Sequence, residues 1–327
     1  MKVMFATYPM AFHTPGGGEV QLLAYKKHLP AFGVEVSLFD PWNPRFKEYD
    51  IIHYFSCVGG SVHFCRFIKQ LNIPLVISSS LWITEETKHL YPVDEIRTQL
   101  DLADRIVANS DIECQKLSEV LTLPREKFVA VPNGIDELFI ERPGPELFRE
   151  FFNLNDPFIL NVGNIEPRKN QLRLAQAMQS FPDYKLVLIG HIRDETYFHE
   201  TVAVAPKQIF YAGYIQHDSV LLRSAYQACR IFVLPSTLET PGLAALEAAA
   251  QGAQLILTEE GCTREYFNTC AQYINPCKVE SISECINLCL TVDLNYKTIF
   301  DAEKYLWINV TNNLMKAYTQ LLDNFSY

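Results

Sequence analysis

The sequence predicts an α/β protein made of two doubly wound lobes in tandem. Three observations favour this fold class. The chain has 327 residues, enough for two domains of average size. Short apolar runs alternate with longer segments of helical period, as in parallel βαβ units. This alternation breaks once, at a stretch of proline and glycine, and then restarts.

The first lobe, residues 1–143, is predicted from six short apolar runs separated by amphipathic segments. The first run carries Lys2 and breaks at Pro9, so we interpret it as a strand and not as a secretion signal. The predicted strands are 2–7, 34–39, 51–54, 75–78, 105–108 and 128–131, and the predicted helices are 19–31, 61–71, 93–102 and 111–121.

The second lobe, residues 144–302, begins where Pro143 and Pro145 flank Gly144, a combination that suits a linker and not regular structure. The last segment, 303–327, is predicted to be a helix long enough to leave the second lobe and pack toward the first. Second-lobe strands are predicted at 158–162, 186–189, 209–211, 231–234 and 255–257, and helices at 170–179, 217–227, 242–251 and 279–290.

Composition limits the class of protein. Hydrophobic residues make up 48% of the chain and charged residues 20%, and no apolar run is long enough to span a membrane. We therefore expect a globular, cytoplasmic protein. The net charge of −10 and the lack of a basic block argue against nucleic acid as a partner. No basic amphipathic helix indicates contact with a membrane surface, which the sequence leaves open together with the oligomeric state.

Metal-ligand patterns are not found in the sequence. The nine cysteines form no CxxC pair, and the eight histidines form no HExxH motif. We expect reduced, mostly buried thiols and no metal site.

The segment 234–252 is the most informative part of the chain, because it follows a buried strand and becomes a helix. Thr240 suits the N-cap, and Pro241 suits the first helical position, where its missing N–H does no harm. The N–H groups of Gly242 and Leu243 would then point outward. The sequence therefore predicts an anion site at this helix start.

Two carboxylates flank that helix start. Glu239 and Glu247 are eight residues apart, about 12 Å along a helix at ~1.5 Å per residue, whereas a pair that cleaves one glycosidic bond lies within about 5–10 Å. We expect them to serve different parts of one extended ligand. A nucleotide sugar fits, with Glu247 on the ribose hydroxyls, the helix start on the diphosphate and Glu239 at the sugar. An ordinary surface glutamate and a helix glutamate are the alternative.

The motif from Glu239 to Glu247, followed by Ala248, Ala249 and Gly252, resembles the EX7E element of retaining glycosyltransferase family four. Further resemblance to the family lies, in the family's order, at residues 16–19, 103–110, 131–136, 162–170 and 211–214 and at Trp307.

This resemblance implies the GT-B fold, in which two Rossmann-like lobes face each other across a cleft. It implies a nucleotide-sugar donor, UDP- or GDP-linked, bound mainly by the second lobe, and a carbohydrate or lipid-linked acceptor bound mainly by the first. The implied reaction moves a hexose-type sugar to an acceptor hydroxyl with retention and without a metal.

The resemblance also suggests roles for single residues. Lys169 and Arg168 would stabilise the departing diphosphate in place of a metal ion, with Glu239 as the third catalytic residue. Gly17 and Gly18 would bring backbone N–H groups to the donor phosphates. For each of these residues an ordinary structural role is the alternative.

Other positions lie at or near the donor site with less definite roles. Tyr214 would border the nucleobase or simply pack as an aromatic. Asn164 follows Gly163 where many family members carry arginine, so one phosphate cation is absent or comes from Arg168.

Three places in the first lobe bear on catalysis or on local structure. Residues 76–82 offer no histidine where many members have one. His53 is interpreted as a strand-end core histidine, with a catalytic role as the alternative. Asn133 and Gly134 are expected to form a turn that needs positive φ.

Two rival functions stay open. The missing arginine and histidine suit a GT-B protein that binds but does not catalyse, and a GT-B nucleotide-sugar epimerase would share the same cleft. A dehydrogenase is disfavoured, because residues 16–18 lack the GxGxxG spacing.

Overall fold

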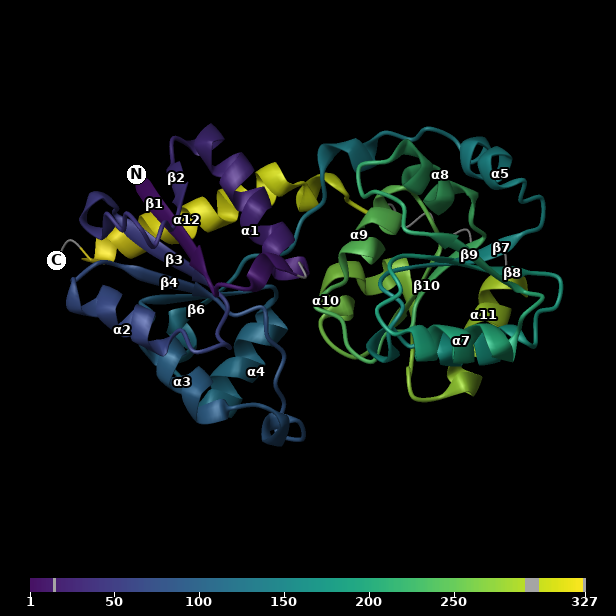
Figure 1. Ribbon diagram of the computed structural model, residues 1–327, viewed down its shortest axis with the longest axis horizontal. Coiled ribbons are helices and arrows are strands. Elements are labelled where there is room, and N and C mark those ends of the chain that lie inside the picture. The colour runs from purple at the N-terminus through teal and green to yellow at the C-terminus, as the bar shows by residue number, and fades with distance from the viewer. Residues whose placement is uncertain (14–15, 292–299, 326–327) are drawn as a thin grey trace. The chain divides into compact units, whose positions relative to one another are not determined.

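The computed structural model describes residues 1–13, 16–291 and 300–325, and the chain forms two compact units (Figure 1). Met1–Gly134 and Glu303–Tyr327 form the first lobe, and Ile135–Ala302 forms the second. The boundary predicted from the sequence, at residue 143, lies farther along the chain than the observed boundary after Gly134. Residues 135–142 belong with the second lobe because Gln251 donates hydrogen bonds to the carbonyl oxygens of Phe139, at 2.7 Å, and Glu141, at 2.9 Å.

The first lobe contains one sheet of six parallel strands in the order β2-β1-β3-β4-β5-β6. Each strand forms where a short apolar run was predicted. The strands are β1 (Lys2–Thr7), β2 (Glu35–Leu38), β3 (Ile51–Phe55), β4 (Leu75–Ser78), β5 (Arg105–Ala108) and β6 (Phe128–Ala130), and the helices are α1 (Gly17–His28), α2 (Val62–Gln70), α3 (Val93–Asp101), α4 (Asp111–Leu121) and α12 (Trp307–Phe325).

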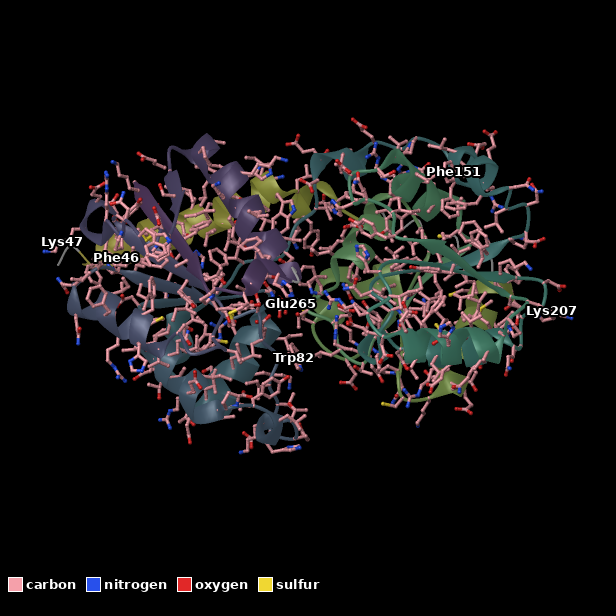
Figure 2. All side chains as sticks on the ribbon, in the orientation of Figure 1. Phe46, Lys47, Trp82, Phe151, Lys207 and Glu265 are labelled. Atoms are coloured by element: carbon pink, nitrogen blue, oxygen red, sulfur yellow. The ribbon has the colours of Figure 1, made fainter. Side chains whose placement is uncertain are left out.

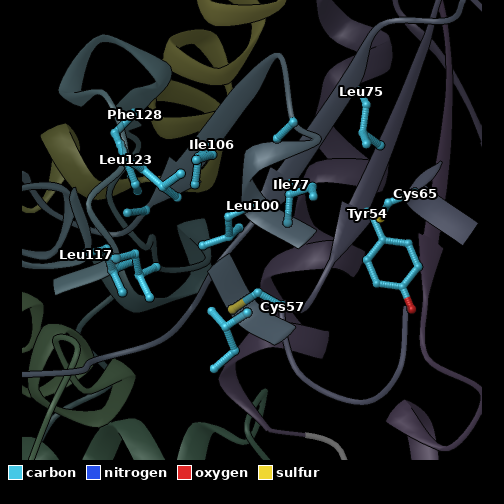
Figure 3. Packing of buried hydrophobic residues seen from close by; sticks show 14 of the residues in the cluster. Tyr54, Cys57, Cys65, Leu75, Ile77, Leu100, Ile106, Leu117, Leu123 and Phe128 are labelled. Atoms are coloured by element: carbon cyan, nitrogen blue, oxygen red, sulfur yellow. The ribbon is translucent and has the colours of Figure 1, made fainter. Parts of the chain in front are cut away.

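Apolar side chains from the strands and the covering helices form the core of this lobe. Ile77 of β4 and Ile106 of β5 are fully buried, and so are Leu100 of α3 and Leu117 of α4 (Figure 3). Burying one such side chain contributes about 1.5–3 kcal/mol. Charged side chains such as Lys47 lie at the periphery (Figure 2).

Helix α12 packs against α1 within the first lobe, as predicted. Trp307, at its first turn, makes an edge contact with Tyr25, with ring centroids 5.9 Å apart. A Cβ atom on Gly134 would lie 2.8 Å from the Trp307 ring. Gly134 is therefore needed for close packing and does not have positive φ, so the predicted turn was wrong.

The second lobe contains another sheet of six parallel strands, in the order β12-β11-β10-β7-β8-β9. Four of its elements were not predicted, namely β12, α5, α7 and α10. The strands are β7 (Phe158–Val162), β8 (Lys185–Ile189), β9 (Ile209–Gly213), β10 (Ile231–Leu234), β11 (Leu255–Thr258) and β12 (Ala271–Ile274), and the helices are α5 (Glu146–Phe152), α6 (Gln171–Met178), α7 (Glu195–Val204), α8 (Val220–Ala228), α9 (Leu243–Ala250), α10 (Thr263–Phe267) and α11 (Val279–Thr291).

The strand orders locate one topological switch point in each lobe. In doubly wound sheets a ligand binds beyond the carboxyl ends of the strands, where the strand order reverses. In the first lobe the order reverses between β1 and β3, and in the second between β7 and β10. Within the part of the chain that the structure describes, no helix is both long and apolar enough to span a bilayer.

Candidate active site

The loops that follow β7 and β10 lie side by side in the second lobe, where the strand order reverses. They contact each other directly, because the backbone N–H of Thr237 donates to the carbonyl oxygen of Arg168 at 2.9 Å. The Arg168 guanidinium in turn donates to the carbonyl oxygen of Leu238 at 3.2 Å. The segment that carries Glu239 is thus fixed against the segment that carries Arg168 and Lys169.

The backbone of Glu239 is also paired with the loop after β11. Its N–H donates to the carbonyl oxygen of Glu260 at 3.2 Å, and its own carbonyl oxygen accepts from the N–H of Cys262 at 3.1 Å. Gly261, with φ of +105°, permits this approach, because a Cβ atom there would lie 2.0 Å from the Glu239 oxygen. Three neighbouring loops therefore hold one glutamate in place.

The Glu239 carboxylate lies between two cations. Its Oε1 atom is 2.5 Å from Lys169 Nζ and 3.9 Å from Arg168 Nη1, and the side chain is only 6% exposed. Burial alone would raise the pKa of Glu239, but the positive charges of Lys169 and Arg168 hold that pKa below its usual range. The three predicted catalytic residues are therefore in one place, with Glu239 ionised.

The predicted N-cap of the following helix was wrong by two residues. Helix α9 begins at Leu243, and the N-cap is Gly242 and not Thr240, while Pro241 lies before the helix. The cause is the pairing of Glu239 with Gly261, which keeps this part of the chain outside the helix. The predicted anion site therefore shifts to the N–H groups of Gly242, Leu243 and the next residue, and it stays a prediction.

Gly242 cannot be replaced without strain. Its φ is +92°, and a Cβ atom would lie 2.7 Å from Leu234 Cδ2 and 3.1 Å from Glu239 Oε2. The start of α9 therefore packs directly beside the Glu239 carboxylate.

Glu247, in the middle of α9, has a separate set of partners. Its Oε1 atom is 2.8 Å from His217 Nε2, and its Oε2 atom accepts a hydrogen bond from the Tyr226 hydroxyl at 2.7 Å. The two carboxylates therefore have different surroundings. The estimate of 12 Å between Glu239 and Glu247 rested on a continuous helix, which the structure does not have.

His217 and Tyr226 were not identified from the sequence as site residues. Both precede Glu247 by more than twenty residues, and only the tertiary fold brings them to it. The sequence contains one indication of His217, because this histidine follows the end of a predicted strand, and ligand-binding loops of parallel sheets lie at the strand ends.

The loop after β7 also contains Gly163 and Asn164. The Lys169 side chain passes over Gly163, where a Cβ atom would lie 3.5 Å from Lys169 Cε. In the amide orientation that satisfies both groups, the Asn164 oxygen accepts two hydrogen bonds of 3.1 Å from Arg193. Arg193 also lies 3.4 Å from Glu166. This additional arginine beside Asn164 was not identified from the sequence.

Tyr214 lies just after β9. Its ring stacks on His191, with centroids 3.8 Å apart and an interplanar angle of 15°, and Tyr214 is 52% exposed. The stacked pair leaves Tyr214 accessible, so its predicted role at the nucleobase stays a prediction.

In the first lobe, Gly17 and Gly18 form the first turn of α1, which begins two residues earlier than predicted. A Cβ atom on either glycine would meet no atom within 4 Å. The N–H of Gly16 donates to the Glu19 carboxylate at 2.7 Å. Thr14 and Pro15, before this loop, lie outside the described residues.

His53 is a core residue of the first lobe. It is fully buried, with Nδ1 2.5 Å from the Tyr318 hydroxyl and Nε2 2.9 Å from Ser78 Oγ. Burial lowers the pKa of His53 to about 3, so the ring is neutral at physiological pH. The structure supports the core interpretation of this histidine over a catalytic one.

Two family models match successive parts of the chain. Residues 43–137 match the model of Glycosyltransferase Family 4, and residues 145–301 match the model of Glycosyl transferases group 1. The two matches together include most of the chain and fall one in each half.

Among curated proteins, the serotype-specific mannosyltransferase WbdA of Escherichia coli is 24% identical over 69% of this chain and 30% of its own length. The O-antigen chain mannosyltransferase B of Escherichia coli is 26% identical over 71% of this chain and 64% of its own length. The matched region thus spans about a third of the first relative and under two thirds of the second.

Among solved structures, Anabaena Alr3699/HepE in complex with UDP superposes with a TM-score of 0.78 at 16% identity, covering 98% of this chain and 100% of that one. This likeness shows the fold. Taken with the two family models, it places the chain in glycosyltransferase family four, with the GT-B fold.

Proposed function

We propose that this chain is a glycosyltransferase that moves a hexose-type sugar from a nucleoside diphosphate sugar to a hydroxyl acceptor, with retention and without a metal ion. The observation that carries the proposal is the placement of Lys169, Arg168 and Glu239 beside the start of α9. Cations and helix N–H groups at a topological switch point suit a diphosphate.

Lys169 is the best placed of the cations for the leaving group. Its side chain is 14% exposed and anchored on Glu239, so little reorganisation is needed when charge develops on the phosphate. Arg168, which is 51% exposed, can turn toward the same phosphate. These two side chains and the start of α9 stabilise the departing diphosphate, which is the role that a metal ion has in other transferases.

The donor extends along the second lobe in this proposal. Glu247 accepts hydrogen bonds from ribose hydroxyls, the N–H groups of Gly242 and Leu243 bind the diphosphate, and Glu239 faces the sugar. Tyr214 borders the nucleobase, and Asn164 lies at the diphosphate, where many family members carry arginine. In the first lobe, the N–H groups of Gly17 and Gly18 bind donor phosphate, and the rest of the lobe binds a carbohydrate or lipid-linked acceptor.

The reaction then needs no covalent nucleophile. The bond from the sugar C1 to the phosphate oxygen breaks, a bond from C1 to the acceptor oxygen forms on the same face, and the acceptor proton passes to the leaving phosphate. Retention rests on membership of the family. The sugar class is supported by two mannosyltransferase relatives and the UDP donor by the UDP complex of a structural neighbour.

The first test is a binding and transfer assay. We expect UDP or GDP to raise the melting temperature and ADP to do so less, and we expect transfer from the matching donor to give a product with the donor's anomeric configuration by NMR. An inverted product would contradict retention. Nucleotide binding without transfer to any acceptor would support a binding protein, and a changed sugar without transfer would support an epimerase.

Two substitutions test the roles of Glu247 and Glu239 separately. Glu247→Ala removes the ribose contact and is expected to raise the dissociation constant of the nucleoside diphosphate about tenfold or more. Glu239→Ala is expected to lower turnover far more than nucleotide affinity. If both variants changed only affinity, Glu239 would have no role at the reacting sugar.

A further inference from the structure

We infer that His217 is a positioning residue that, with Tyr226, orients Glu247 toward the two ribose hydroxyls and makes nucleotide affinity depend on pH. The inference rests on the proposed function, in which Glu247 is the ribose anchor. It adds a residue outside the matched EX7E motif and a property that the motif does not predict.

The hydrogen bonds of Glu247 fit this role. An ionised carboxylate offers about four acceptor positions, two on each oxygen. His217 occupies a position on Oε1, and the Tyr226 hydroxyl occupies one on Oε2. One position on each oxygen is then left, which matches the two neighbouring hydroxyls of a ribose. Because a separate group holds each oxygen, the plane of the carboxylate is fixed before the ligand binds.

Exposure distinguishes the two supporting residues. Tyr226 is fully buried and Glu247 is 4% exposed, whereas the His217 side chain is 46% exposed. His217 therefore forms the accessible border of the Glu247 carboxylate. Its ring also lies against Phe139, with centroids 5.1 Å apart, so the orientation of the imidazole is restrained as well.

The surroundings of His217 favour its cationic form. Its Nδ1 atom lies 3.8 Å from Asp136 Oδ2, so the ring bridges the carboxylates of Asp136 and Glu247. Asp218 adds a third negative charge, while Tyr226 and Phe139 are neutral. Burial by itself lowers the pKa of His217, but the Glu247 hydrogen bond and the three carboxylates outweigh it, and the net pKa is raised above 6.5.

The charge has a consequence for the ligand. A cationic His217 offsets the negative charge of Glu247, which otherwise repels the diphosphate of an incoming nucleotide. Because the pKa of His217 is raised above 6.5, this benefit is present at acidic pH and is lost as the pH rises through the pKa of His217 in the folded protein.

Isothermal titration of UDP and of GDP tests the inference in the full chain between pH 6 and pH 8.5. The variants are His217→Gln, which keeps a donor without the charge, and His217→Ala, which removes both. His199→Gln is the matched control, because His199 is 77% exposed on α7 of the same lobe. The ratio of variant to wild-type dissociation constants at each pH cancels the ionisation of the nucleotide itself.

We expect His217→Ala to weaken binding about tenfold at pH 6. His217→Gln should bind several-fold more weakly than wild type at pH 6 and nearly equally at pH 8.5, and the control should bind as wild type at both. A His217→Gln ratio that does not change with pH overturns the role of the charge. Unchanged affinity in both variants overturns the positioning role, and circular dichroism of His217→Gln checks that the fold is intact. Failure of the wild type to bind any nucleoside diphosphate contradicts the proposed function instead.

Discussion

The carboxyl ends of the two parallel sheets carry different chemistry. In the second lobe, Lys169, Arg168 and Glu239 form an ionic cluster at the point where the strand order reverses. In the first lobe the corresponding strand carries His53, which is neutral and satisfied by Tyr318 and a serine. The point of strand reversal thus carries clustered charges of both signs in the second lobe, whereas in the first lobe it carries a buried, neutral histidine.

Further neutral groups surround His53's sheet. Gln21 donates hydrogen bonds of 2.9 Å to both Asn109 and Asn133, and all three are buried. Met10 and Phe12, in the loop after β1, are 66% and 47% exposed. The two lobes therefore share a sheet topology and differ in the side chains at and beyond the strand ends.

Removing Lys169, the central cation of the second lobe, should have the largest effect, and that effect should be on turnover. Lys169→Ala is expected to lower kcat about 10²–10³-fold, because the departing phosphate loses a preorganised positive charge. Steady-state kinetics with the donor identified by the nucleotide panel measure the effect. Lys207→Ala is the matched control, since Lys207 is exposed at the edge of the same lobe (Figure 2). Equal rates for the two variants would remove Lys169 from the mechanism.

Replacing His53 in the first lobe should instead lower the stability of the protein and leave nucleotide affinity unchanged. His53→Ala leaves the Tyr318 hydroxyl and Ser78 Oγ without their buried partner and is expected to lower the free energy of unfolding by about 3 kcal/mol. Urea denaturation measures the loss, with the exposed His89→Ala as control. Nucleotide affinity should stay unchanged, and a large change in affinity with unchanged stability would give His53 a role at the ligand.

Substitution of a glycine by alanine should also affect stability differently in the two lobes. Gly242→Ala is expected to lower the free energy of unfolding by about 1–3 kcal/mol, because φ is +92° and the new Cβ meets Leu234. Gly17→Ala should not lower stability, because the position is helical and open. If the N–H of Gly17 binds phosphate, the donor KM of Gly17→Ala should rise in a stable protein. A donor KM equal to that of wild type would argue against that contact.

The smallest expected effect is on acid stability. Lys169 and Arg168 hold the pKa of Glu239 below 4.5 in the folded protein, so its ionisation contributes stability above pH 4.5 that is lost as the pH falls through the lower, folded value. Between pH 5 and pH 3 the wild type should therefore lose more unfolding free energy than Glu239→Gln. Parallel losses in both proteins would show that Glu239 is not the responsible group.

The strands were predictable where burial is complete. All four residues of β4 and of β10 are buried, and such runs are evident as apolar segments in the sequence. Strand β12 was missed because two of its four residues, Gln272 and Tyr273, are only partly buried at the edge of the sheet. Helix α10 has five residues, too few to show a helical period.

The site was predictable where its residues lie in one motif. Glu239 and Glu247 stand out by their spacing, and Lys169 by the resemblance of its loop. The start of α9 was misplaced because a local capping rule does not include the pairing of Glu239 with Gly261. His217 and Arg193 were missed because tertiary contacts alone bring them to Glu247 and Asn164.

The return of α12 to the first lobe has a consequence for the synthesis of the protein. In topological terms the second lobe is an insertion within the first, because the first is built from residues on both sides of it. A ribosome completes the inserted lobe before it releases Trp307, whose ring packs on Tyr25. Synthesis of the first lobe therefore starts before that of the second lobe and finishes after it. Until α12 emerges, the face of α1 that α12 covers stays open to solvent or to a chaperone.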